Sequence, residues 1–205
     1  ARRFNAREDV RRMLAETLDR MCAAGTPPDV ITFAGNGEPT LHPDFEAIID
    51  DTLALRDRHC PTAKVSVLSN ATQIGREDVR RALLRVDNNL LKLDSAFDET
   101  VRLINNPAGN YTVARTVELM KLFEGHLIVQ TMFLRGMCNG RRVDNTTERE
   151  VTAWLDLVRE IAPRQVMVYS LDRDTPCPTL EKVPKEELQA IARRVEAAGI
   201  PCTAA

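Results

Sequence analysis

A glycine-rich stretch followed by one carboxylate is the part of this chain whose residue types best suit chemistry. Gly35 and Gly37 are separated by one residue and are followed by Glu38 and Pro39. Glycines let the backbone approach a ligand closely and leave N–H groups free to donate hydrogen bonds. Glu38 is the only charge in the stretch, so it suits a cation such as the ammonium group of an amino acid. The alternative is an ordinary strand-to-helix turn with a solvated glutamate.

A charged pair in a later apolar segment is the second candidate. Lys92 lies among Leu90, Leu91 and Leu93, and Asp94 follows. Residues two apart lie on the same face of a strand, so Lys92 and Asp94 should share one face. Burying two charges is costly unless they meet each other or a ligand. We interpret the pair either as part of a ligand site or as a structural ion pair inside a parallel sheet.

Polar side chains also occur in or just after the other predicted strands. These residues are Ser69, Asn70, Gln130, Arg135, Tyr169 and Asp172. Arg135 would suit a carboxylate or phosphate, and a solvated loop arginine is the alternative. Gln130 lies among apolar residues and must find hydrogen-bond partners, either in the protein or on a ligand.

Alternating strands and helices must position these side chains. The predicted strands cover residues 30–34, 65–68, 90–94, 127–134, 166–169 and a last segment that begins at 200. The predicted helices cover residues 5–24, 45–55, 79–84, 112–123, 147–161 and 184–198. Asn5 with Glu8, and Thr147 with Glu150, have the capping-box spacing that marks a helix start.

This alternation is typical of βαβ units and predicts an α/β protein with a parallel sheet. No Gly/Ser-rich linker interrupts it, so we expect a single domain over residues 1–205. An open doubly wound sheet and a full or partial (β/α) barrel both fit the pattern. Either architecture would place a ligand at the carboxyl ends of the strands.

The composition is that of an ordinary globular protein, with 28% charged and 43% hydrophobic residues. The net charge is −2 and the basic residues are scattered, which argues against a broad nucleic-acid surface without excluding a local one. No apolar run approaches the roughly 20 residues that cross a bilayer, and no signal peptide opens the chain. We therefore expect a cytoplasmic protein without a membrane partner.

The cysteines indicate neither a disulfide framework nor a zinc site. Their number is odd, their spacing is wide, and no two form a C-x-x-C pair. Such cysteines favour a reducing compartment. They are Cys22, Cys60, Cys138, Cys177 and Cys202.

Several ordered motifs together resemble those of radical S-adenosylmethionine (SAM) enzymes. They are Gly35-Asn36-Gly37-Glu38-Pro39, Ser69-Asn70 and Lys92-Leu93-Asp94, each at the end of a predicted strand. Together with residues 129–136 and 168–173, they resemble one branch, which holds wyosine-synthase-like proteins and uncharacterised bacterial relatives. The resemblance runs along nearly the whole chain. It implies a partial (β/α)₆ TIM-like barrel of parallel strands whose mouth holds SAM and a [4Fe–4S] cluster.

The resemblance also implies roles for residues. Members of the family cleave SAM reductively, and the resulting 5′-deoxyadenosyl radical abstracts a hydrogen from the substrate. Glu38 and its glycines would hold the SAM ammonium, and Ser69-Asn70 would lie near the carboxylate or ribose. Lys92 and Asp94 would face ribose or substrate. Lys92 and Arg135 are the candidates for a catalytic role. The implied SAM-binding residues are Gly35, Asn36, Gly37, Glu38, Pro39, Ser69, Asn70 and Asp94.

The family binds its cluster through a C-x-x-x-C-x-x-C loop, and these 205 residues contain none. In the family that loop and the first strand precede the helix that begins here near residue 5, so we expect the cluster cysteines N-terminal to Ala1. Truncation and a true loss of the cluster are the two explanations, and the intact SAM-side motifs favour truncation. Either way, this chain as given should not reduce SAM alone, because its scattered cysteines offer no substitute ligands.

The resulting hypothesis is the SAM-binding core of a radical SAM oxidoreductase. Its partners would be a small-molecule or macromolecular substrate and an electron donor such as flavodoxin or ferredoxin. One alternative is a non-catalytic remnant that binds SAM or docks onto a partner. Another is a tRNA-modifying, wyosine-type enzyme, and the balance of 28 basic against 30 acidic residues counts against it.

Overall fold

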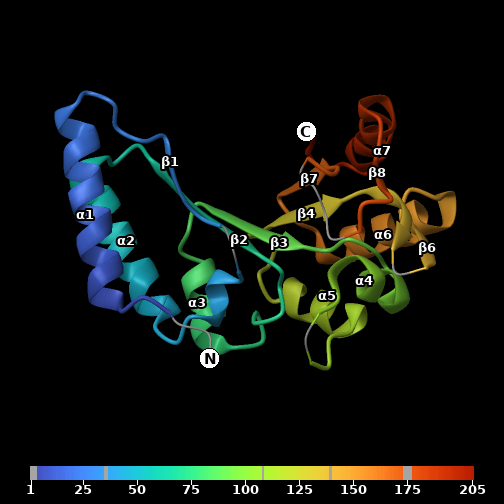
Figure 1. The fold of residues 1–205 in the computed structure, drawn as a ribbon, viewed down its shortest axis with the longest axis horizontal. Helices are drawn as coiled ribbons and strands as arrows, with labels where there is room; N and C mark the ends of the chain where they lie inside the picture. The colour runs from blue at the N-terminus through green and yellow to red at the C-terminus, as the bar shows by residue number, and fades with distance from the viewer. Residues whose placement is uncertain (1–3, 35–36, 108, 139, 173–176) are drawn as a thin grey trace. The chain divides into compact units, whose positions relative to one another are not determined.

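The computed structural model describes residues 4–34, 37–107, 109–138, 140–172 and 177–205. The chain divides into two compact units, Ala1–Leu90 and Leu91–Ala205 (Figure 1). The single domain expected over residues 1–205 stays a prediction. Among the described residues, no helix combines the length and the apolar character that a membrane crossing requires.

The first unit pairs two parallel strands and packs helices beside them. Its elements are α1 (Arg7–Ala23), β1 (Val30–Phe33), η1 (Pro39–Leu41), α2 (Phe45–His59), β2 (Lys64–Ser69) and α3 (Glu77–Leu83). Strands β1 and β2 are parallel, with Val30 opposite Lys64 and Phe33 opposite Val67. Helices α1 and α2 lie side by side (Figure 1).

The contact between α1 and α2 has an apolar part and a charged part. Leu18 of α1 packs in a cluster with Leu55 of α2 and Cys60. Arg7 donates hydrogen bonds of 2.7 and 2.9 Å to the Asp51 carboxylate. The predicted capping box of Asn5 and Glu8 is wrong, because the N-cap is Ala6, which has no side-chain acceptor.

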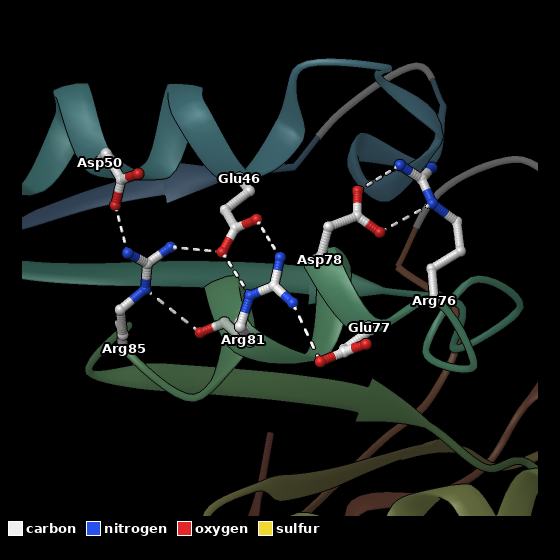
Figure 2. A network of polar contacts seen from close by, with 7 residues as sticks. All are labelled: Glu46, Asp50, Arg76, Glu77, Asp78, Arg81 and Arg85. Carbon is white, nitrogen blue, oxygen red and sulfur yellow. Dashed lines mark hydrogen bonds and ion pairs between the residues drawn. The ribbon is translucent and has the colours of Figure 1, made fainter.

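A network of charged side chains joins α2 to the α3 region (Figure 2). Arg81 donates two hydrogen bonds to Glu46, at 2.9 and 2.7 Å, and lies 3.2 Å from Glu77. Arg85 contacts Asp50 and Glu46. Hydrogen bonding to Glu46 raises the pKa of Arg81, and the same bonds lower the pKa of the Glu46 carboxyl.

Replacing Arg81 with methionine should lower Tm by about 1–3 °C, since exposed ion pairs contribute little individually and this one is bidentate. The folded pKa of Glu46 lies below its ordinary value of 4.5, so its contribution is present above that pH and is lost as the pH falls through the folded value. Thermal unfolding should therefore show a smaller difference at about pH 3 and in about 1 M salt. Arg159→Met, which removes an ion pair to Asp156 within one helix, is the control and should change Tm less. A difference insensitive to both pH and salt would rule out the ion pairs as its cause.

The second unit contains most of the helices and strands. Its elements are β3 (Asn88–Lys92, which crosses the division), α4 (Asp98–Asn105), α5 (Val113–Lys121), β4 (Ile128–Met132), β5 (Leu134–Cys138), β6 (Arg141–Asp144), α6 (Glu148–Ile161), β7 (Gln165–Tyr169), β8 (Leu180–Lys182), α7 (Lys185–Ala197) and β9 (Cys202–Ala204). Strand β7 is parallel to both β4 and β9.

The described parallel strands form one six-stranded sheet in the order β1-β2-β3-β4-β7-β9. This confirms the predicted α/β class and the parallel arrangement. Among the described strands the sheet is open, with β1 and β9 at its two ends, as in a partial barrel. The predicted N-cap of α6 is also confirmed, because the Thr147 side chain accepts a hydrogen bond from the Glu150 N–H at 3.3 Å.

The single long strand predicted over residues 127–134 is wrong. The Phe133 N–H donates to the Tyr169 carbonyl at 2.8 Å, and the chain then leaves the parallel sheet. From Leu134 on it forms β5, the centre of an antiparallel sheet with the order β6-β5-β8. Gly136 is required there: its φ is +133°, and a Cβ would lie 2.3 Å from the Thr179 carbonyl oxygen.

This antiparallel pairing overturns one expectation about the cysteines. Cys138 and Cys177 form a disulfide, with Cα atoms 5.3 Å apart and a separation of 39 positions in sequence. The Thr179 hydroxyl donates to the Met137 carbonyl at 2.6 Å, so the segment leading into β8 lies against the end of β5. Sequence spacing could not show this pair because strand pairing, not proximity along the chain, brings it together.

Candidate functional site

The Glu38 carboxylate joins the segment after β1 to the end of β2. Its Oε1 accepts hydrogen bonds from the Thr40 N–H at 3.1 Å, the Thr40 hydroxyl at 2.5 Å and the Ser69 hydroxyl at 2.8 Å. Its Oε2 accepts one from the Asn70 N–H at 2.6 Å. Thr40 and Ser69 are buried and Glu38 is half-buried. Two strand ends are thus fixed to each other by one carboxylate.

These contacts bear on the predicted ammonium-binding role of Glu38. A carboxylate oxygen has two lone pairs, and Oε2 accepts one hydrogen bond from the described residues. Oε2 therefore keeps acceptor capacity for one further donor, which an ammonium group can provide. Within the described residues, however, the contacts of Glu38 position its own loop and the loop after β2.

The neighbouring candidate residues lie around this carboxylate. Pro39 is the first residue of η1, and Gly37 is exposed just before Glu38. Gly35 and Asn36 lie outside the described residues. Ser69 is the last residue of β2, and its hydroxyl oxygen accepts a hydrogen bond from the Ala71 N–H at 3.1 Å.

Asn70 forms a local turn at the end of β2. Its side-chain oxygen accepts hydrogen bonds from the Thr72 N–H at 3.0 Å and the Thr72 hydroxyl at 2.7 Å. Ala71 has a φ of +62°, a left-handed conformation that costs a non-glycine residue about 1–2 kcal/mol. Strained backbone of this kind is frequent at ligand-binding loops.

Lys92 and Asp94 meet in the second unit, as period-two spacing predicted. The Lys92 Nζ lies 3.3 Å from the Asp94 Oδ2, and the Asp94 side chain is fully buried. The Met132 N–H donates to Asp94 Oδ1 at 2.8 Å, and the Asn105 amide donates to Oδ2 at 2.6 Å. Asp94 Oδ1 therefore has a neutral donor, and Oδ2 has one charged and one neutral donor.

Two asparagines around Asp94 were missed by sequence reasoning. Asn105 lies at the end of α4, a helix that was not predicted. The Asn145 amide donates to the carbonyls of Asp94 and Met132, both at 2.8 Å, and is buried. A buried asparagine just after β6 leaves no sequence signal beyond its residue type.

The Lys92 side chain and the nearby Tyr169 phenol both keep their protons at neutral pH. Burial by itself would lower the pKa of Lys92, but the Asp94 carboxylate and the Tyr169 phenol outweigh this effect and raise it. Burial raises the pKa of the Tyr169 phenol. Lys92 is therefore an ammonium and Tyr169 a neutral phenol.

Arg135, the other catalytic candidate, has a partner of its own. It lies on β5 in the antiparallel sheet, and its guanidinium donates to Glu187 of α7 at 2.5 Å. This hydrogen bond raises the pKa of Arg135. Glu38, Ser69 and Asn70 belong to the first unit, and Lys92, Asp94 and Arg135 to the second.

The cysteines do not match the thiolate set of a [4Fe–4S] cluster, which takes several neighbouring cysteines. Cys138 and Cys177 are joined in the disulfide, Cys60 is buried in the α1–α2 core, and Cys202 lies on β9. The described part of the chain contains no group of three or more His, Cys, Asp or Glu side chains that could hold a metal ion. Binding of a [4Fe–4S] cluster stays a prediction, and it requires thiolate ligands other than these cysteines.

Comparison with known sequences identifies relatives of unassigned activity. No protein-family model matches the chain. The UPF0026 protein slr1464 of Synechocystis is 31% identical over 153 residues, which cover 72% of this chain and 52% of that protein. The UPF0026 protein MJ1312 of Methanocaldococcus jannaschii is 27% identical over 168 residues, or 80% of this chain and 48% of that protein. The chain therefore spans about half the length of these two relatives.

A further relative carries the name of a different protein class. The GTPase Obg of Brachyspira hyodysenteriae is 25% identical over 173 residues, which cover 82% of this chain but 24% of that protein. The present chain has no G-x-x-x-x-G-K-[ST] sequence, the loop that holds nucleotide phosphates in such GTPases.

Several solved structures that resemble this chain are radical SAM enzymes. SuiB of Streptococcus suis, bound to S-adenosylmethionine, matches with a TM-score of 0.68 and 13% identity over 98% of this chain and 42% of that chain. A domain of a pyruvate-formate lyase-activating enzyme from Bacteroides vulgatus matches with a TM-score of 0.62 and 14% identity, over 85% and 98% of the two chains. Archaeal TYW1 matches with a TM-score of 0.61 and 12% identity, over 96% of this chain and 65% of that chain. The chain thus has the fold of radical SAM enzymes, which confirms at the level of the fold the resemblance seen in its motifs.

Proposed function

We propose that this chain is the SAM-binding core of a radical SAM oxidoreductase. The observation that carries the proposal is the Glu38 carboxylate, which holds two strand ends together in a fold shared with the SAM-bound SuiB. In an α/β sheet of this kind, ligands bind at the carboxyl ends of the strands. Glu38, Ser69 and Asn70 all occupy such ends.

In this proposal each candidate residue has a defined part. The free lone pair of Glu38 Oε2 accepts an N–H of the SAM ammonium, and Pro39, the first residue of η1, follows it directly. Ser69 and Asn70 lie near the SAM carboxylate or ribose. Asp94 is fully buried and is held by Asn105 and the Met132 N–H, so it acts on ribose or substrate through Lys92, which lies 3.3 Å away.

The reductive step needs components that this chain does not supply. Its cysteines do not match a cluster-binding set, so the thiolates of a [4Fe–4S] cluster would come from residues outside these 205. An electron donor such as flavodoxin or ferredoxin would complete the system. We therefore assign SAM binding, and not SAM reduction, to the chain by itself.

Calorimetric titration with SAM tests this assignment. Wild-type protein should bind SAM, and Glu38→Gln should weaken binding about 10- to 100-fold, because a charge-assisted hydrogen bond is worth about 1.5–3 kcal/mol. Glutamine keeps the size of the side chain but removes its charge and one of its two acceptor oxygens.

Glu77→Gln provides a matched control on the same unit, since Glu77 is 74% exposed and lies in the charged network beside Arg81. It should bind SAM like the wild type. Absence of SAM binding by the wild type contradicts the proposal. Equal affinity of wild type and a folded Glu38→Gln variant would remove Glu38 from the site.

A further inference from the structure

One face of the sheet in the second unit gathers polar and soft apolar side chains. The Leu93 N–H donates to the Gln130 carbonyl at 3.0 Å, which in a parallel pair aligns Lys92 with Gln130. Gln130 is opposite Met167, and Met132 is opposite Tyr169. The side chains that share this face, here called the Lys92 face, are Lys92, Asp94, Gln130, Met132, Met167 and Tyr169.

The other face of the same strands is closed by a helix. Leu93, Thr131 and Val168 are at most 1% exposed. Trp154 of α6 donates to the Leu93 carbonyl and to the Thr131 hydroxyl, both at 3.1 Å. On the Lys92 face, by contrast, every residue except Asp94 is half-exposed. A ligand can therefore reach the Lys92 face.

Two hydrogen-bond donors on this face lack an acceptor among the described residues. The Lys92 ammonium has three N–H groups and lies 3.3 Å from the Asp94 carboxylate, which can occupy one of them. Tyr169, opposite Met132 on the neighbouring strand, shares this face and interacts with Lys92 electrostatically. An ammonium can only donate, so the phenol O–H beside it is available to donate to a third group. Asp94 also accepts hydrogen bonds from the Asn105 amide and the Met132 N–H, which hold it in place beside Lys92. An ammonium beside a phenol O–H is a two-donor site for an oxyanion.

The surface next to these donors is apolar and adaptable. Met132 and Met167 are half-exposed, and the Gln130 amide lies 3.8 Å from the Met167 sulfur. Thioether side chains adapt to irregular hydrocarbon surfaces. The face thus offers charge and donors at one position and a hydrocarbon surface beside it.

We propose that the Lys92 face binds an organic carboxylate with an apolar body, its carboxylate on Lys92 Nζ and the Tyr169 hydroxyl and its hydrocarbon against Met132 and Met167. Only the identification of this ligand as the substrate rests on the proposed function. The binding of the ligand depends on residues of the second unit alone. Lys92 and Tyr169 are then binding residues, and Asp94 positions Lys92.

Hexanoate is a suitable probe, with hexan-1-ol and hexylamine as ligands of equal chain length and different head groups. In protein labelled with [methyl-¹³C]methionine, hexanoate should shift the Met132 and Met167 methyl signals and leave those of Met13 and the buried Met120 unchanged. Hexan-1-ol should bind at least about tenfold more weakly, because it lacks the charge-assisted hydrogen bonds. Hexylamine should not bind at the ammonium. No shift with hexanoate up to about 20 mM, where weak millimolar binding would be visible, overturns the proposal. Equal binding of hexan-1-ol also overturns it.

Variants separate the two donors from general packing. Tyr169→Phe removes one hydroxyl and should weaken hexanoate binding about three- to tenfold, and Lys92→Gln about tenfold or more. Lys121→Gln, an exposed lysine of the same unit paired with Glu118, is the control and should bind hexanoate normally. If Lys92→Gln does not fold, the hexanoate affinity of Tyr169→Phe still tests the proposal. An affinity equal to that of the wild type overturns the assignment of the Tyr169 hydroxyl as a donor to the ligand.

SAM also carries a carboxylate, so the experiment must distinguish the SAM carboxylate from that of a second ligand. With SAM at saturation, hexanoate should still shift Met132 and Met167 to the same extent. Displacement of hexanoate by SAM would give the site to the SAM carboxylate, which overturns this inference and leaves the proposed function intact. Hexanoate binding to a protein that binds no SAM would contradict the proposed function and support this inference.

Discussion

Replacing Trp154 with alanine is expected to lower the free energy of unfolding by about 3–5 kcal/mol. Trp154 is 1% exposed on α6, and its ring meets Phe133 edge to face with centroids 5.3 Å apart. Its indole N–H donates to the Leu93 carbonyl and to the Thr131 hydroxyl. The substitution leaves a large cavity and removes a donor from two buried acceptors, and both effects destabilise the fold.

Urea unfolding followed by circular dichroism measures this effect. Fluorescence would not serve, because Trp154 is the only tryptophan of the chain. Trp154→Phe keeps an aromatic ring but loses the N–H donor and part of the indole volume, so its loss should be smaller, about 1–3 kcal/mol. Leu122→Ala, at a residue that is 51% exposed, should stay within about 0.5–1 kcal/mol. A loss below about 1 kcal/mol for Trp154→Ala would contradict the packing of α6 on this sheet.

Replacing Asp94 with leucine should cost a similar amount, about 3–5 kcal/mol, because it leaves Lys92 charged without its partner. The Asp94 side chain is fully buried, and that of Lys92 is 22% exposed. The substitution also strips the Met132 N–H and the Asn105 amide of their acceptor. Both consequences act on the folded state alone.

A double variant and a pH series identify the charge as the cause. Lys92→Met added to Asp94→Leu should restore part of the lost stability, since no unpaired charge then remains. The folded pKa of Lys92 is raised above its ordinary 10.5, so its stabilising contribution is present below that pH and is lost as the pH rises through the folded value. The difference between wild type and Asp94→Leu should therefore be constant between about pH 6 and 9 and shrink above it. Asp156→Leu, at an exposed carboxylate of α6, is the control. If the double variant is less stable than Asp94→Leu alone, the unpaired charge is not the cause.

The strongly periodic parts of the fold could be predicted from the sequence, and the departures have local physical reasons. The six parallel strands follow runs of apolar and β-branched residues. Strand β4 was extended too far because Phe133 and Leu134 continue the apolar run, while the chain in fact pairs Leu134 with Lys182 of β8 in a different sheet. Helix α4, which has eight residues and ends at the left-handed Asn106, was not predicted. Strands β6 and β8 were also missed, since their stability comes from pairing with β5.

The candidate site divides in the same way. Period-two spacing sufficed to place Lys92 and Asp94 together, because both lie on one strand end. It could not show that Glu38 would bond Ser69 and Asn70, which are 31 and 32 residues away and meet it through the parallel pairing of β1 and β2. Nor could it show that Arg135 would pair with Glu187 of α7, 52 residues away. Such contacts depend on strand register and helix packing, which residue types alone do not specify.

Formation of 5′-deoxyadenosine tests the central claim most directly. The natural protein should be reconstituted anaerobically with iron and sulfide, reduced with dithionite, incubated with SAM and analysed by liquid chromatography and mass spectrometry. We expect 5′-deoxyadenosine and methionine from wild-type protein that carries the cluster-binding cysteines together with this chain, and much less from its Glu38→Gln variant at the same SAM concentration. Protein that binds SAM and carries an intact cluster, yet forms no 5′-deoxyadenosine, would contradict the radical SAM function and favour a SAM-binding protein without catalysis.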